Sequence, residues 1–247
     1  MRRWAVPPTT RSGCRDVDDM NAPWPATEEA LVAAQRELAS ASPAPWRAAG
    51  GAQAVAGCFV CFSRGRVGPG AAGEPGWAAA ALVVGTERTR IAVVTGEAPA
   101  PYVAGLLALR DGPLLEAAVR QLPACPEVLL VNATGRDHPR RAGMALHLGA
   151  RLEIPSVGVT DQPLIARGDW PADEPGAQGL LRIENDVVGC WLRARRGVRP
   201  IVVHPGWRID LETAVAVVVN STHGARTPEP LRQARRAARE ARAASIA

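Results

Sequence analysis

The stretch that most constrains the fold is VLLVNATGRDHPRRAGMALHLGARLEIPSVGVTD, residues 128–161. Two apolar runs rich in β-branched residues, Val128 to Val131 and Ile154 to Val159, enclose a segment with helical spacing, which predicts strand, helix and strand. Such a unit implies parallel strands joined by a right-handed crossover. Ligands of α/β sheets bind at the carboxyl ends of the strands. The candidate functional residues are therefore the polar ones after these ends: Asn132, Thr134, Asp137, His138, Thr160 and Asp161.

Apolar patterns elsewhere predict the rest of a mixed sheet with helices against it. Residues 26–40, with Thr27 as the cap and acidic residues in the first turn, predict an amphipathic helix. Residues 54–62 predict a strand that is apolar on both faces and therefore central. Two more strands, at 77–85 and 88–94, follow over short connections and indicate an antiparallel meander. The fold class is therefore α/β, a mixed β-sheet flanked by helices.

Length and charge narrow the class of protein. At 247 residues the chain is long enough for one domain with a substantial core. All 29 basic residues are arginine, and with 24 acidic residues the net charge is +5. This surplus is compatible with phosphate-bearing partners, although a genome-wide preference for arginine codons also explains it. No apolar run of about 20 residues is present, so no membrane span is expected, and the absence of an apolar leader predicts a cytoplasmic protein.

Several motifs carry a family resemblance. HPRRAGMALHLG (138–149), followed by IPSVGV (154–159), resembles the central block of the endonuclease V family, nucleases that cut nucleic acid near deaminated adenine. PYVAGLLALRDGPLL (101–115), RPIVVHPGWRIDLETAVAVV (199–218) and TPEPLRQARR (227–236) resemble flanking segments of that family in the same order. The resemblance implies a ribonuclease-H-like fold. It delimits a domain at residues 28–240, after a Pro-rich extension at 1–27 and before a frayed tail at 241–247.

The positions where that family holds magnesium are changed. The resemblance places Phe59 where the family has its first Asp, Asp111 where it has Glu, and Asn132 where it has its second Asp. Magnesium requires hard oxygen ligands, normally from two or more carboxylates. We therefore expect no metal cofactor, and we predict that the family's nuclease reaction is lost or severely weakened.

Two further changes affect charge and shape. Asp161 stands where the family has a lysine, and an anion there opposes phosphate by Coulomb repulsion, which favours a substrate without phosphate, or a cation. Trp207 stands where the family has a histidine and offers a stacking face to a flat ligand.

The resemblance also implies substrate-binding residues. Tyr102 lies on a loop that in the family acts as a wedge beside a displaced base, although a ring on a loop can equally be packing. Gly135 turns the chain after Asn132, and His138 and Arg140 open the predicted helix in the segment that lines the family's base pocket. His138 is expected to be neutral, because the helix dipole disfavours a cation at a helix start.

Several residues keep more than one interpretation. Asp111, before Gly112 and Pro113, is either the cap of a new helix or a cleft residue. Asp137 either caps the next helix or joins Asp111 and Asp161 in an acidic cluster, and His147 is expected to be a satisfied core histidine.

Two surface segments are equally open to interpretation. The acidic loop at 168–178 is either a lid or a solvated insertion. A basic edge either contacts phosphate or keeps a strand soluble; its arginines are Arg193, Arg195, Arg196 and Arg199.

Three functions follow from these observations. The first is an endonuclease V-like pseudoenzyme that retains nucleic-acid binding. The second is a repurposed enzyme that acts on a small molecule in the old cleft, with Asp111, Asp161 and His138 as catalytic groups. The third is a weakly active endonuclease V in DNA repair that uses Asp111 and Asp137.

Overall fold

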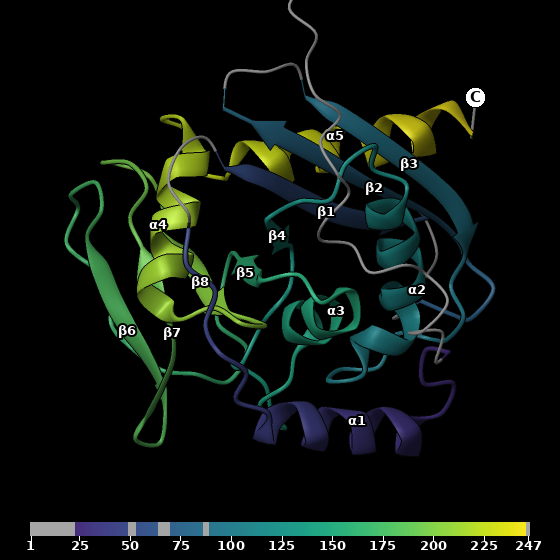
Figure 1. The fold of residues 1–247 in the computed structure, drawn as a ribbon, viewed down its shortest axis with the longest axis horizontal. Helices are drawn as coiled ribbons and strands as arrows, with labels where there is room; N and C mark the ends of the chain where they lie inside the picture. The colour runs from purple at the N-terminus through teal and green to yellow at the C-terminus, as the bar shows by residue number, and fades with distance from the viewer. Residues whose placement is uncertain (1–22, 49–52, 64–69, 86–88, 246–247) are drawn as a thin grey trace, which may run out of the picture.

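The computed structural model describes residues 23–48, 53–63, 70–85 and 89–245, which form a mixed sheet flanked by helices (Figure 1). The sheet has eight strands in the order β3-β2-β1-β4-β5-β8-β7-β6. β1 pairs in parallel with β4, and β4 with β5, whereas the other neighbours are antiparallel. This arrangement confirms the predicted fold class. The strands are β1 (Ala54–Phe62), β2 (Pro75–Val84), β3 (Arg90–Glu97), β4 (Val128–Val131), β5 (Ser156–Thr160), β6 (Gln178–Ile183), β7 (Asp186–Leu192) and β8 (Ile201–Pro205).

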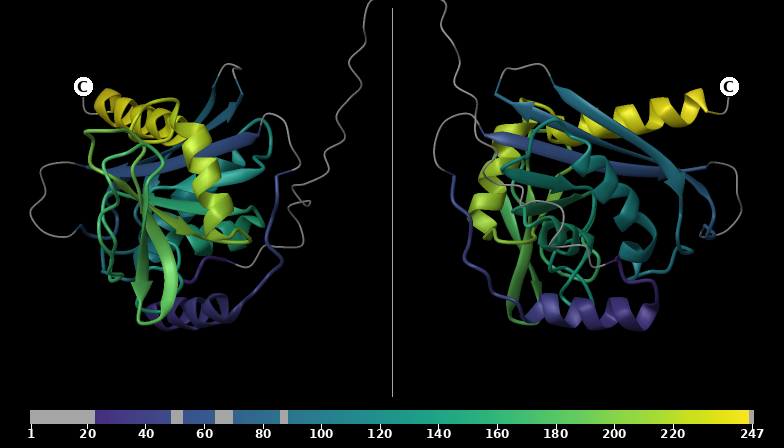
Figure 2. Two further views of the ribbon diagram at one scale, coloured as in Figure 1. Left: turned by 90° about the vertical axis from the view of Figure 1, so that its left-hand side faces the viewer. Right: turned by 45° about the vertical axis from the view of Figure 1, so that its right-hand side comes forward.

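Helices cover both faces of the sheet. They are α1 (Glu28–Ser40), α2 (Leu107–Arg120), α3 (Met144–Leu152), α4 (Leu211–Thr222) and α5 (Glu229–Ala244). One apolar core joins α2 and α3 to alternate residues of β1, β2 and β4, and Leu31 of α1 is fully buried in it. A second core joins α4 to the other face of the central strands. Figures 1 and 2 show α1 and α5 at opposite ends of the molecule.

The first helix and first strand form where their local sequence predicts them. The Thr27 hydroxyl accepts a hydrogen bond from the Ala30 amide at 3.2 Å, which satisfies one of the free donors at the start of α1. β1 spans 54–62, is buried on both faces, and lies between β2 and β4 as expected of a central strand.

α5 approaches β1 closely because residue 57 is a glycine. A Cβ atom there would lie 2.4 Å from the carbonyl carbon of Pro230, so any side chain would push α5 away. At its far end, α5 continues to Ala244. The Trp77 indole donates to the Ser245 hydroxyl at 2.9 Å, which anchors this end of the helix.

Two helix boundaries differ from prediction. α2 runs without a break from Leu107 to Arg120 with Pro113 inside it, so Asp111 lies within a helix and is not a cap. α3 begins only at Met144, so His138 and Arg140 lie in turns ahead of the helix. None of the helices in the described ranges is long and apolar enough to cross a membrane.

The packed part of the chain starts earlier than residue 28. The Trp24 ring stacks on His147 with centroids 5.0 Å apart, and its indole N–H donates to Glu116. This tryptophan therefore joins α2 to α3. The rest of the predicted extension, residues 1–22, lies outside the described part of the chain.

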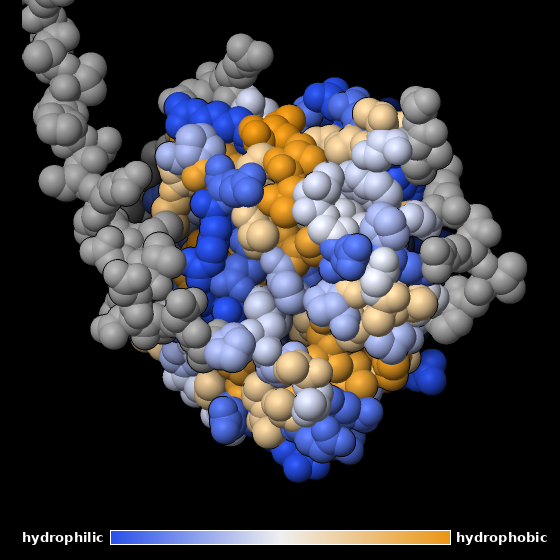
Figure 3. Space-filling model, turned by 90° about the vertical axis from the view of Figure 1, so that its right-hand side faces the viewer, coloured by the Kyte–Doolittle hydropathy of each residue, from blue (hydrophilic) through white to orange (hydrophobic). Residues whose placement is uncertain are grey.

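At the other edge of the sheet, β3 is the outer strand, and it exposes Ile91 and Val93 by 42% and 40%. The side of the molecule beside β3 shows hydrophobic patches interspersed with hydrophilic surface (Figure 3).

Candidate functional site

The centre of the candidate site is a notch at the end of β4. β4 stops at Val131, which pairs with Cys58, whereas β1 continues to Phe62. A pocket of about 50 Å³ at this point is lined by residues of β1, α2, α3 and the end of β4: Cys58, Phe59, Val60, Leu107, Asp111, Leu115, Asn132, Ala133 and Met144. The structure therefore brings together Phe59, Asp111 and Asn132, as the resemblance implied. Side chains from both faces of the sheet can reach this notch.

Asp111 enters the pocket from α2. Its Oδ1 is buried and has no hydrogen-bond partner, and burial raises the pKa of this carboxyl to about 7, although neighbouring Arg110 lowers it. Arg110 does not neutralise Asp111 by direct contact, because its guanidinium pairs with the buried Glu74 and donates to the carbonyl oxygens of Ala71 and Ala100. Asp111 thus keeps its proton to a much higher pH than an exposed aspartate.

Arg235 enters the notch from α5 on the opposite face. Its Nη2 donates to Asn132 Oδ1 at 2.8 Å. Its guanidinium carbon lies 5.3 Å from the centre of the Phe59 ring, and that of Arg239 lies 5.8 Å from the same ring. A fixed cation therefore contacts both substituted positions. Our sequence reasoning missed Arg235, although its signal was available: Arg235 and Arg239 are one helical turn apart in the predicted tail helix.

Asp161 follows β5 and is largely solvent-exposed. It forms an ion pair with Arg226, whose Nη1 lies 2.6 Å from Asp161 Oδ1. Arg226 also donates to the carbonyl oxygens of Arg199 and Pro200, so it bridges the ends of β5 and β8. The negative charge expected to repel phosphate is therefore balanced by a neighbouring arginine.

His138 and Arg140 do not line the pocket at the notch. Both contact the Gly105 carbonyl oxygen instead. His138 Nε2 lies 3.2 Å from the Gly105 carbonyl oxygen, and its Nδ1 accepts from the Arg140 amide at 3.2 Å. The Arg140 guanidinium donates to the same Gly105 carbonyl at 2.7 Å and to Gln35 of α1. These bonds require a neutral His138. Burial and Arg140 lower the pKa of His138, so the cause of neutrality is not a helix dipole.

The remaining predicted substrate-binding residues are dispersed. Tyr102 is 45% exposed on the loop before α2, as a wedge would need to be. At Gly135 a Cβ atom would lie 2.2 Å from the Pro205 carbonyl oxygen, so the glycine permits close backbone packing. Trp207 contacts Ser156 at the start of β5: its carbonyl oxygen accepts from the Ser156 amide, and its amide donates to the Ser156 hydroxyl. Since Asn132 follows the opposite end of the paired strand β4, Trp207 does not face the notch.

Asp137 neither caps α3 nor joins an acidic cluster. It is fully buried and accepts hydrogen bonds from the backbone amides of Leu164, Ile165 and Ala166 at 2.6 to 2.9 Å. Nδ1 of the buried His204 lies 3.9 Å from Asp137 Oδ2. Within the described residues, no three His, Cys, Asp or Glu side chains form a group that could hold a metal ion.

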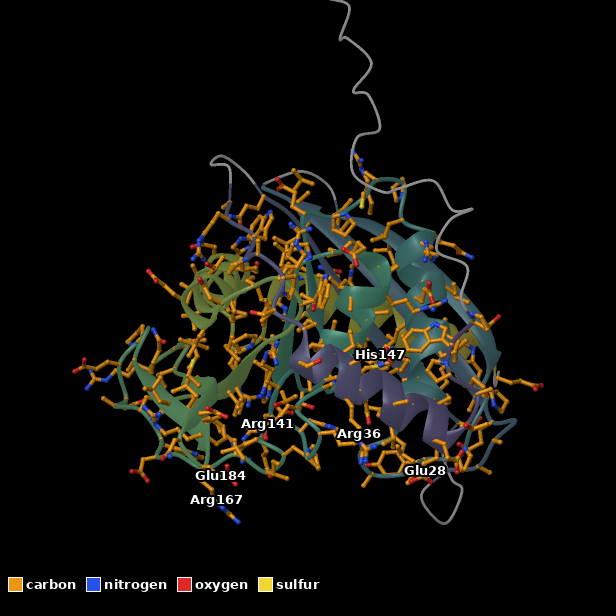
Figure 4. All side chains as sticks on the ribbon, turned by 60° about the horizontal axis from the view of Figure 1, so that its bottom comes forward. Glu28, Arg36, Arg141, His147, Arg167 and Glu184 are labelled. Atoms are coloured by element: carbon orange, nitrogen blue, oxygen red, sulfur yellow. The ribbon has the colours of Figure 1, made fainter. Side chains whose placement is uncertain are left out.

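His147 lies in the core, behind α1 in the view of Figure 4, which also shows Arg36 on α1 and Arg141 beside the β6 hairpin. It is buried as predicted, but its Nδ1 has no hydrogen-bond partner, so stacking on Trp24 takes the place of the expected polar contact. Burial lowers the pKa of His147 to about 4.

The acidic loop is attached to the basic edge. The Gly176 amide donates to the Arg193 carbonyl oxygen at 2.8 Å, and the Arg193 amide donates to Ala177 at 2.9 Å. The Trp170 ring, 54% exposed, lies 5.7 Å from the guanidinium carbon of Arg199. Arg193 is mostly buried, so part of the predicted basic edge is internal packing.

Comparison with known proteins assigns the family. The family model for endonuclease V matches residues 47–236. The endonuclease V of Thermus thermophilus is 38% identical over 221 residues, 86% of this chain and 92% of the relative. That of Geotalea uraniireducens is 44% identical over 140 residues, 57% of this chain and 60% of the relative.

Solved structures agree with this assignment. The crystal structure of endonuclease V from Streptomyces avermitilis superimposes with a TM-score of 0.78 at 34% identity, covering 91% of this chain and 96% of that one. Human endonuclease V gives a TM-score of 0.78 at 28% identity, covering 90% and 100%. With most of its length matched by the family model and by a full-length relative, this chain belongs to the endonuclease V family.

Proposed function

We propose that this protein binds nucleic acid on an endonuclease V scaffold but does not cut it. The observation that carries the proposal is the position of Arg235, which bonds to Asn132 and lies against Phe59. A guanidinium at this point repels a second cation, such as a metal ion. It also occupies the Asn132 side-chain oxygen, which is then not available as a metal ligand.

The residues of the notch do not fit a magnesium ion. Phe59 supplies no ligand, Asn132 Oδ1 already accepts a hydrogen bond, and Asp111 is the only carboxylate among the residues that line the pocket. Burial raises the pKa of Asp111 to about 7, which reduces its charge at neutral pH. Magnesium needs several hard, charged oxygen ligands, so a single buried carboxylate is a poor site.

Support for nucleic-acid binding comes from the cationic side chains around the notch. Arg226 and Arg239 both lie close enough to Arg235 to lower its pKa. A Ciona intestinalis endonuclease V of the same fold was crystallised with a DNA that contains an inosine followed by a ribo-adenosine. We propose nucleic acid with a deaminated base as the target here too, with exposed Tyr102 available to contact an unstacked base.

Binding and cutting by the purified full-length chain test this proposal. Fluorescence anisotropy with deoxyinosine and matched deoxyadenosine oligonucleotides should show affinity that falls steeply between about 50 and 200 mM salt. Incubation with Mg²⁺ or Mn²⁺ should leave both oligonucleotides intact. Cutting that disappears in Asp111→Ala would contradict the proposal and support a weakly active endonuclease.

A second candidate is a small-molecule enzyme, favoured by the unpartnered Oδ1 of Asp111. A carboxyl with a pKa of about 7 suits general acid–base chemistry. The other proposed groups, His138 and Asp161, are not among the residues that line its pocket, and each already has a partner. Absence of nucleic-acid binding, together with a small ligand whose binding is lost in Asp111→Asn, would favour this function.

A further inference from the structure

We infer that Arg235 and Arg239 form an anion site that holds a backbone phosphate of the bound nucleic acid without any metal ion. This inference rests on the proposed function and specifies which contact replaces the metal. It concerns the side of the notch formed by α5, Phe59 and Asn132.

The arginines of α5 differ in their partners, and Arg242 near its end donates to the Phe62 carbonyl oxygen of β1. Arg232 pairs with Glu229, and Arg236 contacts Gln233 and Glu240. Arg235 and Arg239, which face β1, form no ion pair with any residue in the described ranges. Arg235 and Arg239 thus lie against a ring of β1 without an acidic partner among the described residues, which leaves their N–H groups available to an anion.

Both of these guanidinium groups lie against Phe59, and Arg235 also bonds to Asn132. Phe59 presents its ring to Arg235 at 5.3 Å and to Arg239 at 5.8 Å, and the Asn132 amide oxygen accepts from Arg235 Nη2. Cation–π contacts and a hydrogen bond restrict the long side chains and reduce the entropy lost when an anion binds. Phe59 and Asn132 thus act as supports for a cation.

The local positive charge is only partly compensated, because Asp161 is the one acidic group that acts on Arg235 against two arginines. Burial is the largest cause that lowers the pKa of Arg235, and Arg239 and Arg226 lower it further, whereas Asp161 raises it. Asp161 itself is already paired with Arg226. Like charges held this close destabilise one another unless an anion lies between them, and a phosphate accepts from guanidinium groups with matching planar geometry.

The test measures DNA binding by variants of the full-length chain in buffer with EDTA and in buffer with MgCl₂. Arg235→Gln and Arg239→Gln remove a proposed phosphate contact, and Arg236→Gln removes the same charge from the solvent side of α5. We expect Arg235→Gln to weaken binding by about tenfold and to reduce the slope of log affinity against log salt by about one. Arg235→Lys should recover part of the affinity, and Arg236→Gln should change it by less than about twofold.

The parent protein should bind equally well with EDTA and with MgCl₂, and loss of binding in EDTA would overturn the inference. Equal affinities of Arg235→Gln, Arg236→Gln and the parent would also overturn it and leave the proposed function standing. Thermal melting with and without sodium pyrophosphate tests the site apart from DNA. Stabilisation of the parent but not of Arg235→Gln, in a protein that does not bind DNA, would support the anion site and refute the proposed function. Melting without ligand shows whether each variant is folded.

Discussion

Replacing Asp111 with asparagine should stabilise the protein at neutral and alkaline pH and have little effect near pH 4. The change keeps the shape of the side chain and removes its ability to ionise. In the folded protein, burial raises the pKa of Asp111 from 3.8 to about 7, and its Oδ1 has no partner to stabilise the charge. Ionisation is therefore more costly in the folded chain than in the unfolded chain.

The sign and size of the effect follow from this difference. Because the folded-state pKa of Asp111 is the higher one, its contribution to stability is fully present below pH 3.8 and is lost as the pH rises through about 7. A difference of this size corresponds to roughly 4 kcal/mol in a fully buried site. Asp111 is only partly buried as a residue, so we expect Asp111→Asn to gain on the order of 2 kcal/mol at pH 8.

Urea denaturation followed by tryptophan fluorescence at pH 4, 6 and 8 measures this gain. Asp169→Asn, on the exposed acidic loop, is the matched control and should follow the parent at each pH. If Asp111→Asn and the parent showed the same free energy of unfolding at pH 4 and at pH 8, Asp111 would have an ordinary pKa and the burial argument would be refuted.

Three other substitutions test the packing around the site. Trp24→Ala should cost about 3 kcal/mol in urea denaturation, because it removes a large ring between two helices; an unchanged midpoint would mean that Trp24 is not packed. Asp137→Asn should lower the free energy of unfolding by about 2 kcal/mol and speed amide hydrogen exchange at residues 164–166, because the Asp137 carboxylate accepts hydrogen bonds from these amides. Unchanged exchange would contradict this role. Gly57→Ala should cost at least about 3 kcal/mol, because its Cβ would clash with Pro230; parent-like stability would show that α5 can move.

Local pattern predicted those elements that depend on local sequence. The continuous apolar run at residues 54–62 predicted β1 with correct boundaries, and Thr27 predicted the start of α1. The segment Asp111 to Pro113 predicted a break that does not occur. A Cβ atom on Gly112 would lie 2.5 Å from the Trp24 ring, so a residue far away in the chain packs against this turn of α2. The packing of Trp24 against α2 thus outweighed the local tendency of Gly112 and Pro113 to end a helix.

By itself, the sequence determined the family, the mixed sheet and the meeting of Phe59, Asp111 and Asn132 at one notch. It could do so because the motifs and the apolar segments follow one another along the chain in the order of that family. Only the tertiary structure decided what else reaches that notch. Arg235 lies 103 residues from Asn132, and no periodicity links the two. Their contact arises because α5 crosses β1 at Gly57, which brings a helix from the end of the chain against the place where β4 stops.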